Sequence, residues 1–462
     1  MRELWYIFCG LTERDRALHQ RSRVTTTTST RAMTALAVLS TLLTAGTSLS
    51  QISVTVSKKY AQRTRIAVPS FHQKAGAPSA ELSSGIAAQL SSDLELSGYF
   101  SPLKKKKFVE ETQADDVRTG KVHIAEWRRI GAEMVVKGST SSSLAGVTVE
   151  CRVYSTAGGR SVFAKRYNAP KSDLRRLAHR IADDIIYAVT GEKGIASTKI
   201  AFVANRSGNK QIYVMDFDGS NARQVSKDKS ICLSPDWSPD GQKLVFTSYR
   251  RSRPELYIQH VAGGSAKGVA FYPGLNATGA ISPDGGSMLL SLSKDGNPEI
   301  YRMNLATGSL RRLTRTRGAE ISPCWSPDGR RIAFVSDRSG SPQIYVMDLA
   351  GKKTRRLTYE GGYNVSPDWS PKGDKIVYSS RRGRDFDLYV IGPDGGASTQ
   401  VTSGSSIDDN PSWAPDGRHV VYESTRKYKS DIYIVDIYER VPVRITKWNF
   451  NSTSPSWSSS LN

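Results

Sequence analysis

Apolar strands and polar turns alternate with a fixed step through the second half of the chain. A turn of the type Trp-Ser-Pro-Asp-Gly recurs every 44 residues, with copies that start at Trp237, Ile281, Trp325, Trp369, Trp413 and, truncated, Trp457. A pair of one apolar residue and one tyrosine keeps the same step, with its tyrosines at 213, 257, 301, 345, 389 and 433. A period of about 40 to 50 residues made of strand-like pieces is typical of a β-propeller.

One repeat unit contains the pieces of a four-stranded blade. The Trp325 strand leads into the turn Ser326–Gly329, where proline presets φ and Asp-Gly tolerates a tight hairpin. Strands are then predicted at Arg331–Ser336, Gln343–Asp348 and Thr354–Thr358, separated by polar turns. A single blade cannot bury both of its faces, so the blades are expected to stack around an axis.

The two ends of the repeat predict how the ring closes. The first unit begins at Lys199–Val203 with no Trp-type strand before it, whereas Ser454–Ser458 is such a strand with nothing after it. Together they complete one blade and remove an open sheet edge. We therefore expect residues 199–462 to form a six-bladed propeller of four-stranded blades, closed by the C-terminal strand, in which the tryptophans and tyrosines pack the blades.

Residues 51–198 predict a small α/β N-terminal domain. An apolar residue at every fourth position from Leu82 to Leu94 indicates an amphipathic helix, and a second stripe runs from Leu174 to Ile185 and ends near Gly191. Short strands are expected at Arg65–Pro69, Val147–Val153 and Val162–Tyr167. The boundary with the propeller is expected near Glu192–Thr198.

Residues 1–50 are expected to be a signal peptide with a possibly mis-called N-terminal extension. The apolar run Ala35–Ala45 is too short to span a bilayer, arginines precede it, and small residues up to Ser50 allow cleavage there. Met33 is a candidate for the true start. The mature protein is then expected to be soluble and to lie outside the cytoplasmic membrane.

Charge and chemistry narrow the function further. The net charge is +22, which favours acidic partners or an anionic surface. No nucleic-acid-binding motif accompanies it. The six histidines have no metal-binding spacing, the four cysteines form no C-x-x-C pair, and no G-x-S-x-G nucleophile elbow is present. We expect no enzyme activity, no cofactor and buried structural thiols. A propeller-gated peptidase-like protein or a small-molecule sensor using the channel remains the alternative.

Several segments resemble the TolB family of the Tol-Pal system. Asp173–Val203 is similar to the junction between the two TolB domains, Ser92–Leu103 resembles a segment of the N-terminal domain, and Pro455–Leu461 fits the truncated close of the family's propeller. The resemblance implies a periplasmic adaptor that supports outer-membrane integrity and cell division. It also implies binding of the Pal lipoprotein through the propeller and of TolA through the mature N-terminus, with a peripheral link to the outer membrane through Pal.

The loops between blades predict the partner-binding site, because loops on a rigid scaffold tend to carry binding residues. The candidates are Leu275, Asn276, Thr278, Glu320, Tyr363, Asn364, Asp408, Asp409, Phe450 and Asn451. The alternative is that the asparagines and acids among them only cap turns. Ile52, Val54 and Val56 alternate with polar residues and could add a strand to TolA, or could form the first strand of the N-terminal domain.

Overall fold

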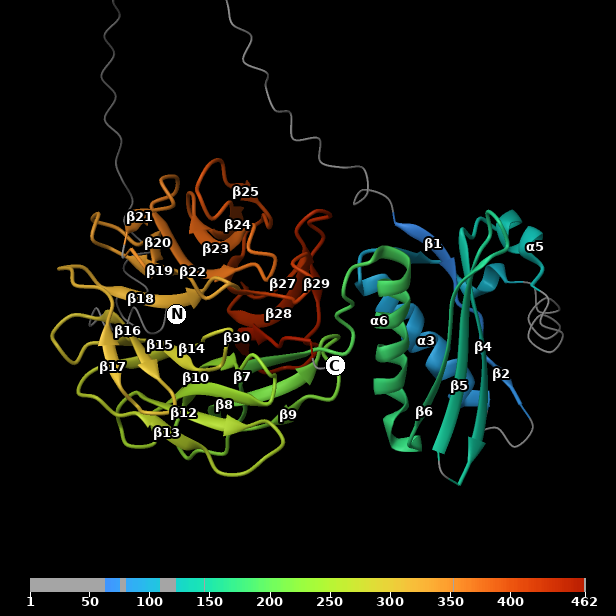
Figure 1. The fold of residues 1–462 in the computed structure, drawn as a ribbon, viewed down its shortest axis with the longest axis horizontal. Helices are drawn as coiled ribbons and strands as arrows, with labels where there is room; N and C mark the ends of the chain where they lie inside the picture. The colour runs from blue at the N-terminus through green and yellow to red at the C-terminus, as the bar shows by residue number, and fades with distance from the viewer. Residues whose placement is uncertain (1–62, 75–79, 109–121, 145, 352, 461–462) are drawn as a thin grey trace, which may run out of the picture. The chain divides into compact units, whose positions relative to one another are not determined.

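The computed structural model describes residues 63–74, 80–108, 122–144, 146–351 and 353–460 (Figure 1). No helix within these ranges is both long enough and apolar enough to cross a membrane. The signal-peptide expectation for residues 1–50 and the candidate TolA segment fall outside these ranges.

The N-terminal domain is a six-stranded sheet with two long helices. Its strands follow the order β3-β1-β4-β5-β6, with β2 paired to β4, and β1 runs parallel to both β3 and β4. Figure 1 shows α3 and α6 side by side on one face of this sheet, and the two helices contact each other. The elements are β1 (Thr64–Ala67), β2 (His72–Gln73), α3 (Ala80–Leu96), β3 (Phe100–Pro102), η2 (Lys105–Lys107), α5 (Ile124–Arg129), β4 (Met134–Ser143), β5 (Gly146–Ser155), β6 (Ser161–Ala169), η3 (Lys171–Asp173) and α6 (Leu174–Thr190).

The predicted strands and helices of this domain are present. Both predicted helices are observed, and α6 ends at Gly191, whose φ of 75° is the left-handed conformation that glycine adopts readily. The predicted hairpin is formed by β5 and β6. The sequence analysis missed β4, the strand that pairs with both β1 and β5.

From residue 199 onward the described chain forms four sheets of four strands and one sheet of eight, arranged as a β-propeller (Figure 1). A single parallel pair, Phe386 with Ile407, joins the two halves of the eight-stranded sheet. The strands are β7 (Lys199–Ser207), β8 (Asn209–Asp216), β9 (Arg223–Gln224), β10 (Cys232–Trp237), β11 (Lys243–Ser248), β12 (Glu255–His260), β13 (Lys267–Ala270), β14 (Asn276–Ile281), β15 (Ser287–Leu292), β16 (Glu299–Asn304), β17 (Leu310–Arg312), β18 (Glu320–Trp325), β19 (Arg331–Ser336), β20 (Gln343–Asp348), β21 (Thr354–Arg356), β22 (Tyr363–Trp369), β23 (Ile376–Arg381), β24 (Phe386–Ile391), β25 (Thr399–Gln400), β26 (Ile407–Trp413), β27 (His419–Arg426), β28 (Lys429–Asp436), β29 (Val443–Arg444) and β30 (Ser452–Trp457).

The last strand pairs with the first strand of the propeller, as predicted. β30 lies antiparallel to β7 in the sheet β30-β7-β8-β9, with Trp457 opposite Ile200. The Trp457 indole N–H donates to the Thr198 hydroxyl at 2.7 Å, and the Ser458 backbone N–H donates to the Lys199 carbonyl at 2.9 Å. The end of the chain is thereby fastened to the start of the propeller.

Repeated tryptophans pack neighbouring sheets together. The Trp237 indole donates to the Ser456 carbonyl at 3.0 Å, and the Trp325 indole donates to the Ala280 carbonyl at 2.9 Å. Each acceptor belongs to the first strand of the preceding sheet, and both indoles are buried. The sequence-based role of these tryptophans as packing residues is therefore confirmed.

The first strand of each repeat contains a β-bulge with a residue in the left-handed conformation. The φ angles at these positions lie between 48° and 56°, and a register shift occurs at each. The residues, spaced 44 apart, are Ser234, Thr278, Ser322, Ser366, Asn410 and Ser454. Such a conformation costs a non-glycine residue about 1–3 kcal/mol, so the surrounding packing must hold it in place.

Carboxylates join the first strands of neighbouring repeats. Asp236 in β10 accepts the Ser456 hydroxyl of β30 at 2.9 Å, and Asp368 in β22 accepts the backbone N–H of Trp413 in β26 at 2.7 Å. Burial raises the pKa of Asp236 to about 6 and that of Asp368 to about 7. These links therefore place ionisable groups where the charged form is disfavoured.

Glu423 makes a similar link between β27 and β30. It accepts the backbone N–H of Ser454 at 2.6 Å and the side-chain amide of Asn410 at 3.0 Å. Burial, followed by the nearby charge of Asp409, raises the pKa of Glu423 to about 7.

The N-terminal domain and the propeller share one hydrophobic cluster. It includes Leu90 and Ile181 from the helices and Phe202 and Tyr213 from the propeller. Beside this cluster, the buried Arg418 guanidinium donates to Asp436 at 2.5 Å and to the Gly98 carbonyl at 3.0 Å. Gly98 has φ of 71°, and a Cβ there would lie 2.7 Å from the Asp436 carboxylate, so glycine is required at this approach.

Removing residues 452–462 should destabilise the whole propeller, because β7 would lose its partner strand and the Trp457 side chain would leave the core. Loss of one buried tryptophan alone typically costs about 3–5 kcal/mol. We expect a lower thermal midpoint in a single calorimetric transition. Removal of Leu461 and Asn462 alone is the control and should leave the midpoint unchanged. An unchanged midpoint for the longer truncation would show that the strand does not close the ring.

Glu423→Gln should reduce the dependence of stability on pH. A carboxyl whose folded pKa lies near 7, above its unfolded value, binds its proton more tightly in the folded state, so stability is lost as pH rises from about 5 through 7. Wild type should lose roughly 1–3 kcal/mol more than Glu423→Gln between pH 5 and 8 in urea unfolding. Replacement of the exposed Glu360 by Gln controls for removing one carboxylate. Parallel pH profiles for wild type and Glu423→Gln would refute this assignment.

Candidate partner-binding face

The loops that carry the predicted site lie at one end of the strands. In the sheet of β10 to β13, Cys232 pairs with Ser248, and Ser248 with Glu255, while Leu256 pairs with Ala270. The starts of β10 and β12 and the ends of β11 and β13 therefore lie at the same end of this sheet. We call the connections at this end, both within and between sheets, the loop face.

Five of the ten predicted binding residues are buried and support the loops from within. Their exposed fractions are 0–1%, and they are Asn276, Glu320, Asn364, Asp408 and Asp409. Glu320 accepts hydroxyls from Thr316 and Ser336, each at 2.7 Å, and pairs with Arg338 at 2.8 Å.

The buried asparagines hold the backbone of their own loops. Asn276 accepts the backbone N–H of Tyr272 at 2.9 Å and donates to the Tyr272 carbonyl at 2.7 Å. Asn364 donates to the Glu360 carbonyl at 2.9 Å and to Gln343 at 2.8 Å. These polar groups satisfy buried backbone atoms, which is the turn-capping alternative from the sequence, and they shape the face from below.

The other five predicted residues are at least partly accessible. Leu275 and Thr278 are half-buried, and Asn451 is exposed. The Tyr363 ring meets the Phe386 ring edge-on at 5.7 Å, and the Phe450 ring stacks on Trp448 at 5.0 Å. The structure thus places apolar and aromatic side chains at the loop face, and the rings of Tyr363 and Phe450 pack against neighbouring aromatic rings.

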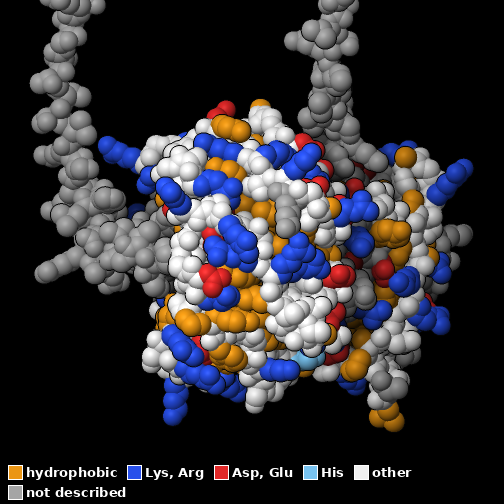
Figure 2. All heavy atoms as spheres, turned by 60° about the vertical axis from the view of Figure 1, so that its left-hand side comes forward, with side chains coloured by type: hydrophobic (Ala, Val, Ile, Leu, Met, Phe, Trp, Pro, Cys, Tyr) orange, Lys and Arg blue, Asp and Glu red, His pale blue; other side chains and the backbone are white. Residues whose placement is uncertain are grey.

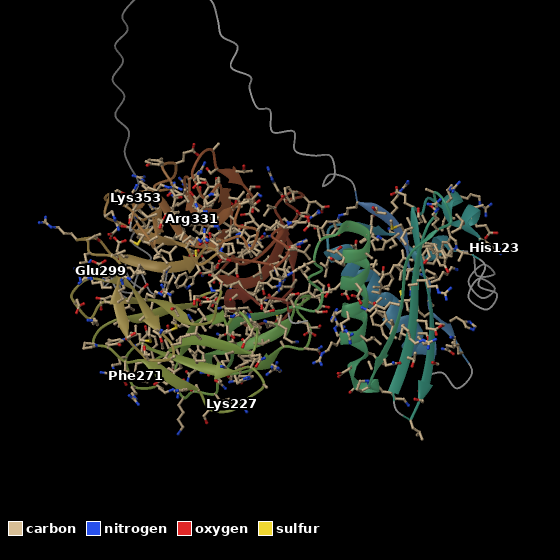
Figure 3. The ribbon with its side chains drawn as sticks, viewed as in Figure 1. His123, Lys227, Phe271, Glu299, Arg331 and Lys353 are labelled. Atoms are coloured by element: carbon tan, nitrogen blue, oxygen red, sulfur yellow. The ribbon has the colours of Figure 1, made fainter. Side chains whose placement is uncertain are left out.

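Three exposed aromatic side chains on these loops were missed in the sequence analysis. Phe271 is 39% exposed, Tyr359 is 74% exposed and Tyr428 is 98% exposed. Figure 3 labels Phe271 on the loop after β13. Tyr428 and Lys427 form the tip of the β27–β28 hairpin with φ of 69° and 47°, where glycine or asparagine is usual. This absence of turn-forming residues between two strands was a signal in the sequence for Tyr428.

Cations cover the loop face, whereas several of its acids are buried beneath them. The side chains of Glu255, Glu299 and Glu320 are 0% exposed and pair with arginines. Arg250 lies 4.0 Å from the centre of the Tyr257 ring, and Arg382 lies 3.9 Å from that of Tyr389.

These arginines belong to a repeated set. A basic residue occupies the same position of every repeat, namely Arg206, Arg250, Lys294, Arg338, Arg382 and Arg426. Figure 2 shows that Lys and Arg side chains outnumber acidic ones on the side of the molecule turned to the viewer. Because these positions lie at or just after the end of the second strand of each repeat, the repeated set places part of the positive charge at the loop face.

The cysteines, the possible metal ligands and the candidate TolA segment were the other features considered from the sequence. Cys151, Cys232 and Cys324 are free and buried, as expected, and burial raises the pKa of the Cys232 thiol to about 12. No group of three His, Cys, Asp or Glu side chains suited to a metal ion occurs among the described residues. Ile52, Val54 and Val56 precede the described part of the chain, whose first strand begins at Thr64.

Family comparisons agree with the two-part architecture. Residues 52–162 match the model of the TolB amino-terminal domain, and residues 187–461 match that of the TolB beta propeller domain. The crystal structure of TolB from Acinetobacter baumannii has a TM-score of 0.78 and 28% identity. The match covers 86% of this chain and 97% of the Acinetobacter baumannii chain.

Curated relatives align over shorter stretches. The Tol-Pal system protein TolB of Geobacter sulfurreducens is 40% identical over 178 residues, which is 38% of this chain and 40% of the relative. The protein of the same name from Geobacter metallireducens is 42% identical over 127 residues, 28% of this chain and 30% of the relative. These alignments thus span less than half of either relative's length. Since the propeller match alone spans more than half of the sequence, the chain belongs to the TolB family.

Proposed function

We propose that this chain is the periplasmic adaptor of a Tol-Pal system, binding Pal through the loop face and TolA through its mature N-terminal segment. Membership of the TolB family makes it an interaction protein and not an enzyme. The observation that best supports a docking role for the loop face is its construction: exposed aromatics stand on loops held by buried polar side chains. A surface fixed in advance loses little conformational entropy on binding.

The proposal includes an assignment of domain boundaries. Residues 1–50 form the export signal with a possible extension, 51–198 the N-terminal domain and 199–462 a six-bladed propeller. The constant 44-residue step supports the blade number if the eight-stranded sheet counts as two blades. The apolar run Ala35–Ala45 supports export, and the name of the relatives, Tol-Pal system protein TolB, supports a place in such a system.

The proposed Pal contact centres on the accessible residues of the loop face. Leu275, Tyr363 and Phe450 supply apolar anchors, with Asn451 beside Phe450, and Tyr428 extends the surface at the tip of its hairpin. Aromatic anchors surrounded by packed neighbours carry most of the binding energy in many interfaces. Asn276, Glu320, Asn364, Asp408 and Asp409 act indirectly in this proposal, by holding the loops.

The proposed TolA contact uses Ile52, Val54 and Val56, whose alternation suits strand addition to a partner's sheet edge. The segment precedes β1, so deleting it removes no residue of the described strands and helices. The two contacts can therefore be separated by mutation.

Leu275→Arg and Tyr363→Ala should each weaken Pal binding by about 2 kcal/mol, roughly 30-fold, while TolA binding is retained. Deleting Gln51–Ser57 should have the opposite pattern, with TolA binding lost and Pal binding retained. Both are measured by isothermal titration with purified Pal and TolA domains. Tyr187→Ala is the matched control, since Tyr187 is 64% exposed but lies on α6, away from the loop face.

The comparison of Pal binding and TolA binding across these variants tests the two proposed contacts separately. Circular dichroism spectra and melting curves must match wild type for each. If Leu275→Arg and Tyr363→Ala fold and bind Pal like Tyr187→Ala, the loop face is not the Pal site. If the deletion leaves TolA binding unchanged, the N-terminal segment is not the TolA site.

A further inference from the structure

A basic cleft lies outside the loop face, between helix α6 and the first strands of the propeller. Its volume is about 910 Å³, a size that suits a small ligand. Figure 1 shows α6 beside β6 in the same domain and β7, β8 and β9 together in the propeller. The charged lining residues are Lys165, Arg175, Arg176, Arg180, Lys199 and Arg223, against Asp173, Asp184 and Asp216. The lining thus has six basic and three acidic side chains, and Arg175 also pairs with Asp218, which is not a lining residue.

Some of these cations are neutralised and others are not. Lys165 pairs with Asp184 at 2.7 Å, and Lys199 pairs with Asp216 at 2.6 Å. Arg180 and Arg223 make no ion pair with any carboxylate in the described part of the chain. Arg180 on α6 and Arg223 on β9 line the same cleft, so both guanidinium groups are available to an anion bound there.

The cleft also holds polar atoms that the protein does not satisfy. The His179 side chain is 4% exposed, and its Nδ1 lies 2.8 Å from Asp93, but its Nε2 has no partner among the described residues. The buried Ser197 hydroxyl likewise has none there. Unsatisfied buried polar atoms are uncommon in folded proteins, and here both belong to residues that line the cleft.

The start of α6 adds to the positive potential. Arg175 and Arg176 bring the first turn of this 17-residue helix to the cleft wall, and Ser172 and Asp173 come from η3 directly before it. The Asp173 side chain makes no capping hydrogen bond to the helix. The dipole at a helix start favours an anion.

We propose that this cleft binds a phosphate group. A phosphate monoester carries about −1.5 to −2 charges and three acceptor oxygens, which suits two unpaired guanidiniums better than a single carboxylate does. The chain's own segment 51–62 does not complement the cleft, because it contains Lys58 and Lys59 and no acidic residue. The phosphate group comes either from a small soluble molecule or from an anionic lipid headgroup.

Titration of the full mature chain tests this site. Inorganic phosphate and glycerol 3-phosphate are added in chloride buffer at constant ionic strength, and vesicles with 20% phosphatidic acid are compared with pure phosphatidylcholine vesicles (roughly the charge density of an anionic leaflet). The double variant Arg180→Gln/Arg223→Gln should bind at least about tenfold more weakly. Arg311→Gln is the matched control, since Arg311 occupies the position of Arg223 two repeats further on.

Each outcome has one meaning. Binding of the soluble phosphates that is lost in the double variant and kept in Arg311→Gln supports a small phosphate ligand. Binding of the phosphatidic acid vesicles alone, with the same variant pattern, supports a lipid headgroup. Absence of binding to all phosphate probes, or equal binding by the double variant and Arg311→Gln, overturns the proposal.

Discussion

The pairing of β30 with β7 is the constraint on which the rest of the propeller depends. A four-stranded sheet of this kind buries its two faces only against neighbouring sheets, so an open ring would leave two faces and one strand edge uncovered. Trp457 links this closure to the domain junction, because its indole bonds to Thr198 directly before β7. The hydrophobic cluster shared by α3, α6 and the first propeller sheet then builds on a fixed β7.

Closure also allows the chain to maintain costly features near the strand starts. Six left-handed residues and several carboxylates with raised pKa values join or bend the first strands. Each would be unfavourable in an isolated hairpin, and each is held by a neighbour in the ring. The same rigidity fixes the loops, since Asn276 and Glu320 extend strand starts into loop hydrogen bonds.

Much of the fold could be predicted from the sequence because the same pattern of strands and turns recurs in every 44-residue repeat. The predicted strands Arg331–Ser336 and Gln343–Asp348 coincide with β19 and β20. β4 was missed because its sequence, MVVKGSTSSS, is largely polar. Its buried Thr140 is satisfied by the Ser83 hydroxyl at 2.7 Å, a contact across 57 residues that no local pattern reveals.

The site was less predictable for a related reason. Polar loop residues such as Asn364 and Asp408 could either face a partner or cap a turn, and only the fold decides that they are buried. The basic cleft brings together residues of both domains that are far apart in sequence, such as Arg180 of α6 and Arg223 of β9. By contrast, the exposed Tyr428 sits in a hairpin turn without glycine or asparagine, which was visible in the sequence.

Native-state hydrogen exchange tests most directly whether closure makes the propeller one cooperative unit. The backbone amides of β30 and β7 should exchange with the same opening free energy as those of β19 and β20 on another sheet, because opening the ring would require unfolding all of it. Exchange of β30 at the rate of a frayed terminus, with β19 and β20 still protected, would contradict the account.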